Sequence, residues 1–214
     1  MLMMNPKNWL ILIVLFCLGI AVTVGITLYV NKDKLENYAE YVQLKEAELN
    51  YWASKADLVD AVNDYIHSVA PMSNLSGVIL VDKCEEYKID IKFVLAQGHL
   101  ESHFGTKGLA AKTNSVWNVG AFDSLSLNEI KHTFSNPNQS VEPYLKLLRE
   151  KYITSKCKTG LLENFVSVDG YRYATSPSYE ASLRHKYEVI TNTTKIDSLQ
   201  EVFRYWIVQS NREY

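Results

Sequence analysis

One carboxyl group in the stretch AQGHLESHFGT, residues 96–106, has the surroundings that acid catalysis needs. Glu101 stands near the end of an apolar helical segment, just before a glycine-containing turn. Burial beside apolar groups raises a carboxyl pKa because it disfavours the charged form. A glutamate whose pKa is raised from about 4.3 toward about 6–7 can protonate a leaving oxygen at neutral pH. The sequence therefore predicts that Glu101 is a general acid, and glycoside hydrolysis is the chemistry that most needs one.

Two neighbouring histidines offer a different chemistry. His99 and His103 are four residues apart and share a helix face, which is a metal-ligand spacing. The zinc-protease motif, however, places glutamate directly after the first histidine, whereas Glu101 comes two residues after it and points to roughly the opposite face. We therefore expect His99 to be packed and His103 to line the cleft or contact solvent, with no metal and no cofactor.

Four sequence blocks occur in an order that resembles the glucosaminidase domain of glycoside hydrolase family 73. They are AQGHLESHFGT at 96–106, NSVWNVGAFD at 114–123, TFSNPNQSVEPYLKLL at 133–148 and YRYATSPSYEASL at 171–183. The resemblance covers residues 60–190. It implies a mainly α, lysozyme-like helical domain that cleaves the glycan strands of peptidoglycan next to N-acetylglucosamine, with Glu101 as the acid.

The resemblance also assigns residues around the cleft. Asn118 and Gly120 match a loop block, in which the asparagine is expected to fix the loop by bonding backbone groups. Tyr173 is expected near Glu101, where its phenol could orient water or hold an acetamido group of the substrate. Trp117 either stacks on a sugar or anchors a loop, and Tyr179 is a core or substrate-binding residue.

A second carboxylate is harder to place. The family often carries one on a hairpin lobe, but here only residues 121–133 fill that gap. Asp123 and Glu129 are the candidates, and Asp123 is the one we favour. Ser176 also replaces a family aspartate. The alternatives are a lysozyme, a lytic transglycosylase, or an inactive wall-binding or assembly module.

The N-terminal part predicts a membrane anchor. Residues 9–30, WLILIVLFCLGIAVTVGITLYV, carry no charge and are long enough to cross a bilayer. We expect a tail at 1–8, a transmembrane helix at 9–30 in contact with lipid, a helical stalk at 31–54 and a catalytic domain at 55–214. Lys7, Lys32 and Lys34 slightly favour a cytoplasmic domain, whereas the resemblance implies that the domain lies outside.

The stalk offers two alternatives. Leu35, Val42 and Leu49 are spaced by seven, which suits a short coiled coil and weak self-association through residues 33–53. Lys45 interrupts the second seam, so a monomeric stalk is the other interpretation. The net charge of −2 gives no indication of a nucleic-acid partner. Cys84 and Cys157 could bridge or stay as buried thiols.

Further helices follow from apolar periodicity and capping residues. One covers Leu58 to Val69 and ends before Pro71. Others cover about 75–87, the segment after the N-cap Asp90, a segment capped by Ser140, and one that begins at Ser176-Pro177. The last covers about 198–209. Gly98 is expected to let another helix approach closely.

Overall fold

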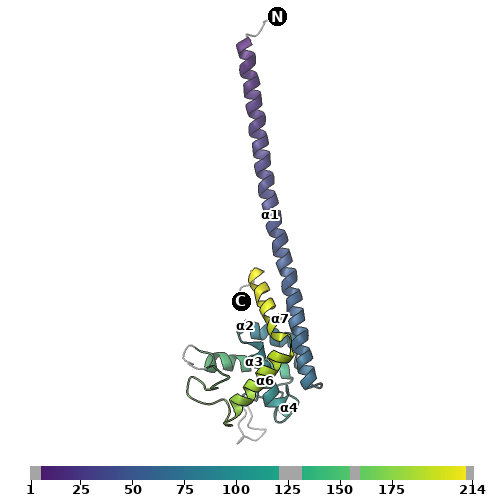
Figure 1. Ribbon diagram of the computed structural model, residues 1–214, viewed down its shortest axis with the longest axis vertical. Helices are drawn as coiled ribbons and strands as arrows, with labels where there is room; N and C mark the ends of the chain where they lie inside the picture. Colours follow the sequence, from purple (N-terminus) through teal and green to yellow (C-terminus); the bar gives the residue numbers. More distant parts are fainter. Residues whose placement is uncertain (1–5, 121–131, 155–159, 211–214) are drawn as a thin grey trace. The chain divides into compact units, whose positions relative to one another are not determined.

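The structure is a computed structural model that describes residues 6–120, 132–154 and 160–210, and only the backbone of residues 6–14. Helices dominate this part of the chain, as Figure 1 shows. Within it no β-strand forms, and one isolated antiparallel bridge joins Val166 and Arg172. The predicted mainly α fold behind an N-terminal helix is therefore confirmed. Asp123, Glu129 and Cys157 lie outside the described residues.

The chain divides into two compact units, residues 1–49 and 50–214, and helix α1 (Pro6–Val69) contributes to both. In the first unit, α1 exposes large apolar side chains from Leu15 to Val30. The hydroxyls of Thr23 and Thr27 donate to carbonyls one turn earlier, at 2.8 and 2.9 Å, so they need no water. This helix is long and apolar enough for a membrane span or a signal anchor.

In the second unit the last turns of α1 supply one wall of the core. Leu58, Val62 and Ile66 are buried along one face of the helix, which ends at Val69 as predicted. Tyr51 is also buried here and packs against Phe203, with ring centroids 5.4 Å apart. The limits proposed for tail, span, stalk and catalytic domain stay a prediction.

Helix α3 (Ile91–Ser102) is the central element of this unit. Every residue from Ile91 to Gly98 is buried, and the helix packs most extensively against α6 (Tyr179–Thr193). Asp90 caps its N-terminus as predicted, because the side chain accepts a hydrogen bond from the Lys92 amide at 3.0 Å. Because most of α3 is buried, the residues of its last turn are held in place by the core.

The remaining helices surround α3. They are α2 (Gly77–Glu86), α4 (Ala110–Thr113), the 3₁₀ turn η2 (Pro137–Ser140), α5 (Val141–Leu147), the π-helical η3 (Leu148–Tyr152) and α7 (Ile196–Gln209). The helix expected after Ser140 forms as α5 and η3, and it buries Val141, Tyr144, Leu145, Leu148 and Tyr152.

Two predicted helix caps differ from the structure. Ser140 occupies the N-cap position of α5 as predicted, but its hydroxyl donates to the Pro137 carbonyl at 2.7 Å and makes no capping hydrogen bond. Helix α6 begins at Tyr179, two residues after Pro177, and the Ser176 hydroxyl pairs with that of Ser178 at 3.2 Å. In both cases the serine bonds within a local turn that the capping rule does not anticipate.

Candidate active site

Glu101 lies in the last turn of α3, where the chain leaves the core. His103 and Phe104 follow in left-handed conformations, with φ of 47° and 53°, and Gly105 has φ of 83°. The Ser102 hydroxyl donates to the Val116 carbonyl at 2.7 Å and accepts from the Gly105 amide at 2.8 Å. These bonds tie the end of α3 to the loop at 114–120, which therefore sits beside Glu101.

The Glu101 carboxyl receives hydrogen bonds on both oxygens. The Tyr179 hydroxyl donates to Oε1, and Nδ2 of Asn118 donates to Oε2 at 3.2 Å. Burial raises the pKa of Glu101 above its ordinary value of 4.5, while the bonds from Tyr179 and Asn118 lower it. Burial is the largest of these effects, so the net shift favours the protonated carboxyl, as the sequence predicted.

Asn118 has a different role from the expected one. Its side chain bonds the Glu101 carboxylate and does not fix the loop through backbone groups. The residue has φ of 51°, a left-handed conformation that asparagine tolerates better than most side chains. Within the described chain, its Oδ1 is buried and has no hydrogen-bond partner. The amide nitrogen therefore bonds the carboxylate, while the amide oxygen stays without a hydrogen bond in the described chain.

Tyr179, and not Tyr173, is the tyrosine that contacts Glu101 directly. Tyr179 is 9% exposed and directly contacts Glu101, although it was expected mainly in the core. Tyr173 lies nearby, with its ring 6.0 Å from that of Tyr179, and its hydroxyl donates to the Trp117 carbonyl at 2.8 Å. The Tyr173 ring also stacks on Phe165 at 4.5 Å. Tyr173 therefore supports the backbone just before Asn118.

Trp117 cannot stack on a sugar, because its side chain is fully buried. Its Nε1 donates to the Val94 carbonyl at 3.1 Å, and its ring stacks on Tyr144 with centroids 4.4 Å apart. The prediction of a substrate-binding role is wrong. The same ring corrects the expectation for Gly98: a Cβ there would lie 3.2 Å from both Trp117 and Phe104, so the glycine admits aromatic side chains and not a helix.

Gly120 is required by the turn that follows Asn118. It has φ of 69°, and a Cβ would lie 2.4 Å from the His132 ring. The left-handed conformation favours glycine, and the close ring excludes a side chain. The structure thus gives Gly120 a backbone role next to the site, and its expected part in substrate binding stays a prediction.

His99, the first histidine of the pair, lines a separate groove. Nδ1 of His99 bonds the Tyr65 hydroxyl at 2.8 Å, and its ring packs edge to face on His103. Burial, followed by nearby positive groups, lowers the pKa of His99 to about 4. Within the described ranges no three histidine, cysteine or acidic side chains gather as a metal site. His99 is packed as predicted, and none of the contacts of His103 with described residues is with Glu101.

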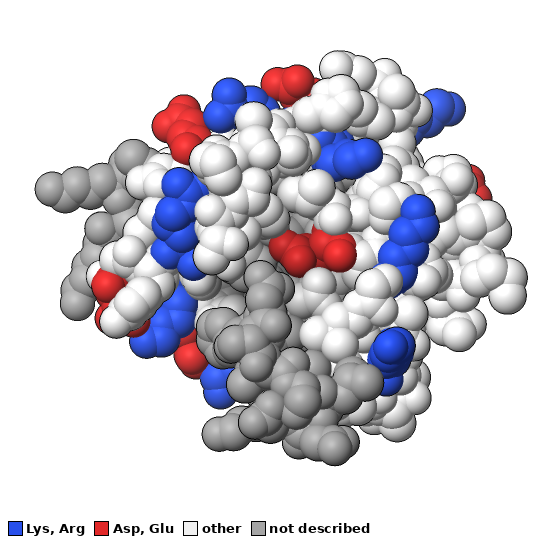
Figure 2. Space-filling view, turned by 90° about the horizontal axis from the view of Figure 1, so that it is seen from below, with Lys and Arg blue, Asp and Glu red and all other residues white. Residues whose placement is uncertain are grey.

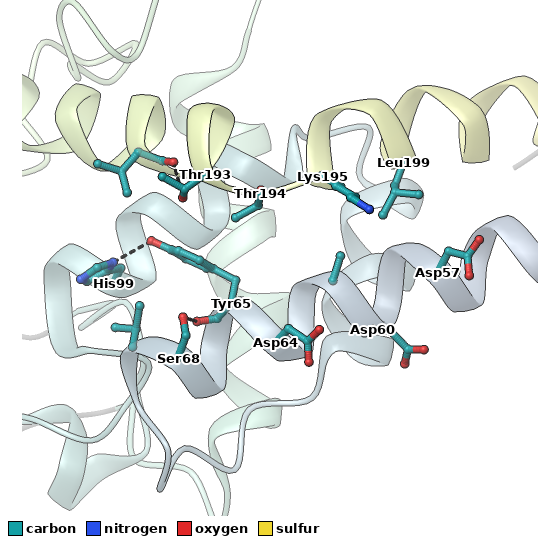
Figure 3. A pocket seen from close by; sticks show the side chains of 13 residues that line it. Asp57, Asp60, Asp64, Tyr65, Ser68, His99, Thr193, Thr194, Lys195 and Leu199 are labelled. Atoms are coloured by element: carbon teal, nitrogen blue, oxygen red, sulfur yellow. Dashed lines mark hydrogen bonds between the residues drawn. The ribbon is translucent and has the colours of Figure 1, made fainter.

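Figure 3 shows this groove, which has a volume of about 880 Å³ and runs between the end of α1 and the α6–α7 connection. Tyr65 and His99 close one end. Asp57, Asp60 and Asp64 project from α1 along one edge, and Lys195 lies across from them. His99 lines this groove and Glu101 does not, so the two side chains have different surroundings.

Two site residues were missed from the sequence. Gln97 and Tyr144 are fully buried, and the Tyr144 hydroxyl donates to Oε1 of Gln97 while Nε2 of Gln97 donates to the Tyr179 oxygen at 3.0 Å. The sequence did contain an indication of Gln97, since this polar residue lies one helical turn before Glu101 in a mostly apolar segment. Tyr144 appeared only as part of a helical apolar face.

Figure 2 shows one face on which a small acidic group lies near the centre, with further acidic and basic side chains scattered toward the edges. Among the residues that are drawn in colour on this face, the basic side chains do not form one continuous patch. Asp123, the favoured second carboxylate, lies outside the described residues.

Glu101 thus combines a buried position at the end of α3 with a phenol donor and an amide donor, which are surroundings that suit a carboxyl acting as an acid. Comparison with known proteins gives the family of the chain. The family model described as mannosyl-glycoprotein endo-beta-N-acetylglucosaminidase matches residues 78–192, and the chain belongs to this glucosaminidase family. The match contains Glu101, Asn118, Tyr173 and Tyr179.

Two curated relatives come from Streptococcus pneumoniae, serotype 4 (strain ATCC BAA-334 / TIGR4) and strain ATCC BAA-255 / R6. Each is named "Putative endo-beta-N-acetylglucosaminidase" and is 29% identical over 144 residues, which is 67% of this chain. The aligned part is 21% of the first relative and 20% of the second. The chain thus spans about a fifth of their length. No solved structure matches it.

Proposed function

We propose that this protein is a membrane-anchored hydrolase that cleaves the glycan strands of peptidoglycan at N-acetylglucosamine, as an endo-beta-N-acetylglucosaminidase. The observation that carries the proposal is the shielded Glu101 carboxyl with donors on both oxygens. Membership of the glucosaminidase family supports the substrate class.

Glu101 acts as the general acid in this proposal. Burial raises its pKa and so favours the protonated carboxyl, whose proton passes to the glycosidic oxygen as the bond to the anomeric carbon breaks. Tyr179 and Asn118 then stabilise the carboxylate that remains, because both donate hydrogen bonds to it. The same two contacts thus matter more after proton transfer than before it.

The group that attacks the anomeric carbon is open to two proposals. Asp123 would act as the second carboxylate of a conventional pair. Alternatively, the 2-acetamido oxygen of the substrate attacks, and Tyr173 holds the acetamido group or orients a water molecule. The short segment 121–133 favours the second proposal, because it leaves little chain for a lobe that carries a carboxylate.

The proposed location follows from the substrate. Helix α1 would anchor the chain through residues 9–30, and the domain at 55–214 would lie on the extracytoplasmic side, where peptidoglycan is found. Protease added to intact spheroplasts should then digest the domain. Protection until lysis would place the domain in the cytoplasm and contradict the proposed substrate.

Product analysis tests the cleaved bond. The full chain in detergent is incubated with purified peptidoglycan, and the new ends are analysed, with Glu101→Gln as the blank. We expect new reducing ends at N-acetylglucosamine. Reducing ends at the muramic acid residue would indicate a lysozyme, and anhydro ends a lytic transglycosylase. Binding to the wall without any product would indicate an inactive wall-binding or assembly module.

A further inference from the structure

A buried chain of three hydrogen bonds leads from α5 to the Glu101 carboxyl. Tyr144 on α5 donates to Oε1 of Gln97 on α3, Nε2 of Gln97 donates to the Tyr179 oxygen on α6, and Tyr179 donates to Oε1 of Glu101. Gln97 and Tyr144 are both fully buried. Such a chain fixes the direction of each donor as well as the position of each atom.

The direction is set at Tyr144. Its ring lies parallel to that of Trp117, with an interplanar angle of 5°, and its hydroxyl donates to the glutamine oxygen. A glutamine amide has one accepting and one donating end. Once its oxygen accepts from Tyr144, its nitrogen faces Tyr179, and the Tyr179 hydrogen must point to Glu101.

The reverse direction is disfavoured. Glu101 would then donate its proton to Tyr179, Tyr179 would donate to the oxygen of a rotated Gln97, and the amide nitrogen would face Tyr144. The Tyr144 hydroxyl would lose the acceptor that it has in the structure. Leaving a buried donor unsatisfied costs about 1–3 kcal/mol.

We propose that Gln97, oriented by Tyr144, is a positioning residue that keeps Tyr179 a donor to Oε1 of Glu101 and thereby places the acidic proton on Oε2. This inference rests on the proposed function of Glu101. A proton on Oε1 would be shared with Tyr179 inside the protein, whereas a proton on Oε2 lies on the oxygen that faces the Asn118 loop. Gln97 is not itself a catalytic residue, because it contacts Tyr179 and not the substrate.

Two variants remove the positioning at different points. Gln97→Met deletes both amide contacts, and Tyr144→Phe deletes only the hydroxyl that orients the amide. The matched control is Tyr65→Phe, which removes a part-buried phenol hydrogen bond to His99 in the separate groove. All three are made in the full chain, and the unfolding temperature of each is recorded.

The decisive readout is the titration of Glu101 by carbon NMR of glutamate-labelled protein, with Glu101→Gln used for assignment. Losing a well-directed donor to the carboxylate should move the midpoint to higher pH in Gln97→Met and Tyr144→Phe, and not in Tyr65→Phe. The phenols of Tyr144, Tyr173 and Tyr179 all face this site, but burial raises the pKa of each, so they do not titrate in the same range.

Hydrolysis should fall roughly tenfold or more in Gln97→Met, as for a lost hydrogen bond to a charged group, with the basic limb of the pH profile displaced in the same direction. A merely structural role would lower stability and leave the titration of Glu101 unchanged, and that result would overturn the proposal. If Glu101→Gln remains active, the proposed function is wrong, while the NMR titration still reports whether Gln97 orients the carboxyl.

Discussion

Nδ2 of Asn118 donates to Oε2 of Glu101 at 3.2 Å, while Oδ1 of the same amide is buried without a partner in the described chain. An asparagine that leaves its own oxygen unsatisfied to face a carboxylate acts on the charge of that carboxylate. The contact between Asn118 and Glu101 therefore links the backbone conformation of the loop at 114–120 to the pKa of Glu101.

Asn118→Asp should raise the pKa of Glu101, because a second carboxylate would replace the donor and repel the first. The two carboxyls would then titrate as a coupled pair. We expect the basic limb of the pH–activity profile to move to higher pH. Asn114→Asp is the control, since Asn114 is also left-handed, with φ of 55°, but donates to the Phe134 carbonyl. A displaced limb in both variants would contradict the assignment.

The raised pKa of Glu101 predicts how Glu101→Gln changes stability with pH. The folded protein holds the Glu101 proton more tightly than the unfolded chain, so the wild type loses stability as pH rises from 4.5 through the folded pKa. Glutamine does not titrate, and the free Oδ1 of Asn118 can accept from its amide after a rotation.

Thermal unfolding of both proteins from acid to neutral pH measures this effect. The difference in unfolding temperature, variant minus wild type, should be near zero at acid pH and should increase toward neutral pH. A constant difference would mean that Glu101 has an ordinary pKa in the folded protein.

Gly120→Ala should destabilise the protein more than Gly170→Ala. Both glycines are left-handed, with φ of 69° and 84°, and an alanine in that conformation costs about 1–2 kcal/mol. Only Gly120 also has the His132 ring 2.4 Å from the added Cβ, whereas Gly170 has nothing within 4 Å.

Denaturant unfolding of the two variants compares these costs, and adding His132→Ala to Gly120→Ala should recover the steric part. Equal destabilisation at the two glycines, with no recovery, would show that the ring does not constrain the turn.

Tyr173→Phe should reduce hydrolysis more than Asp123→Asn or Glu129→Gln. The Tyr173 hydroxyl supports the Trp117 carbonyl next to Asn118, and in the substrate-assisted proposal it also serves the acetamido group. Rates on the same wall preparation decide between the proposals. If either carboxamide variant is as inactive as Glu101→Gln while Tyr173→Phe stays active, a conventional carboxylate pair operates.

Helices were predictable where apolar periodicity and a single cap act together. Asp90 caps α3, and the helix that was expected after this cap forms, because both signals are local. Ser140 stands at the N-cap position of α5 without a capping bond, and Ser176 lies before the start of α6. The hydroxyl of each serine bonds within its own turn. Local sequence does not show which of two nearby partners a hydroxyl chooses.

The site was predictable only in part. The position of Glu101 at a helix end is local, whereas its contacts with Asn118 and Tyr179 join residues 17 and 78 positions away. Trp117 shows the limit most clearly: an aromatic residue beside a cleft suits a sugar platform as well as a core, and only packing against Tyr144 decides. The place of Gln97 in the site is recognised only from its hydrogen bonds with Tyr144 and Tyr179 in the structure.

The most direct test of Glu101 as general acid compares two substrates. Peptidoglycan needs a proton on its leaving oxygen, whereas a dinitrophenyl glycoside of an N-acetylglucosamine oligomer releases a stable anion without one. Rates of both reactions are measured for the wild type and for Glu101→Gln. We predict a loss of at least about a hundredfold on peptidoglycan and of less than about tenfold on the aryl glycoside. Equal losses on the two substrates, or full activity on peptidoglycan, would contradict the role of Glu101.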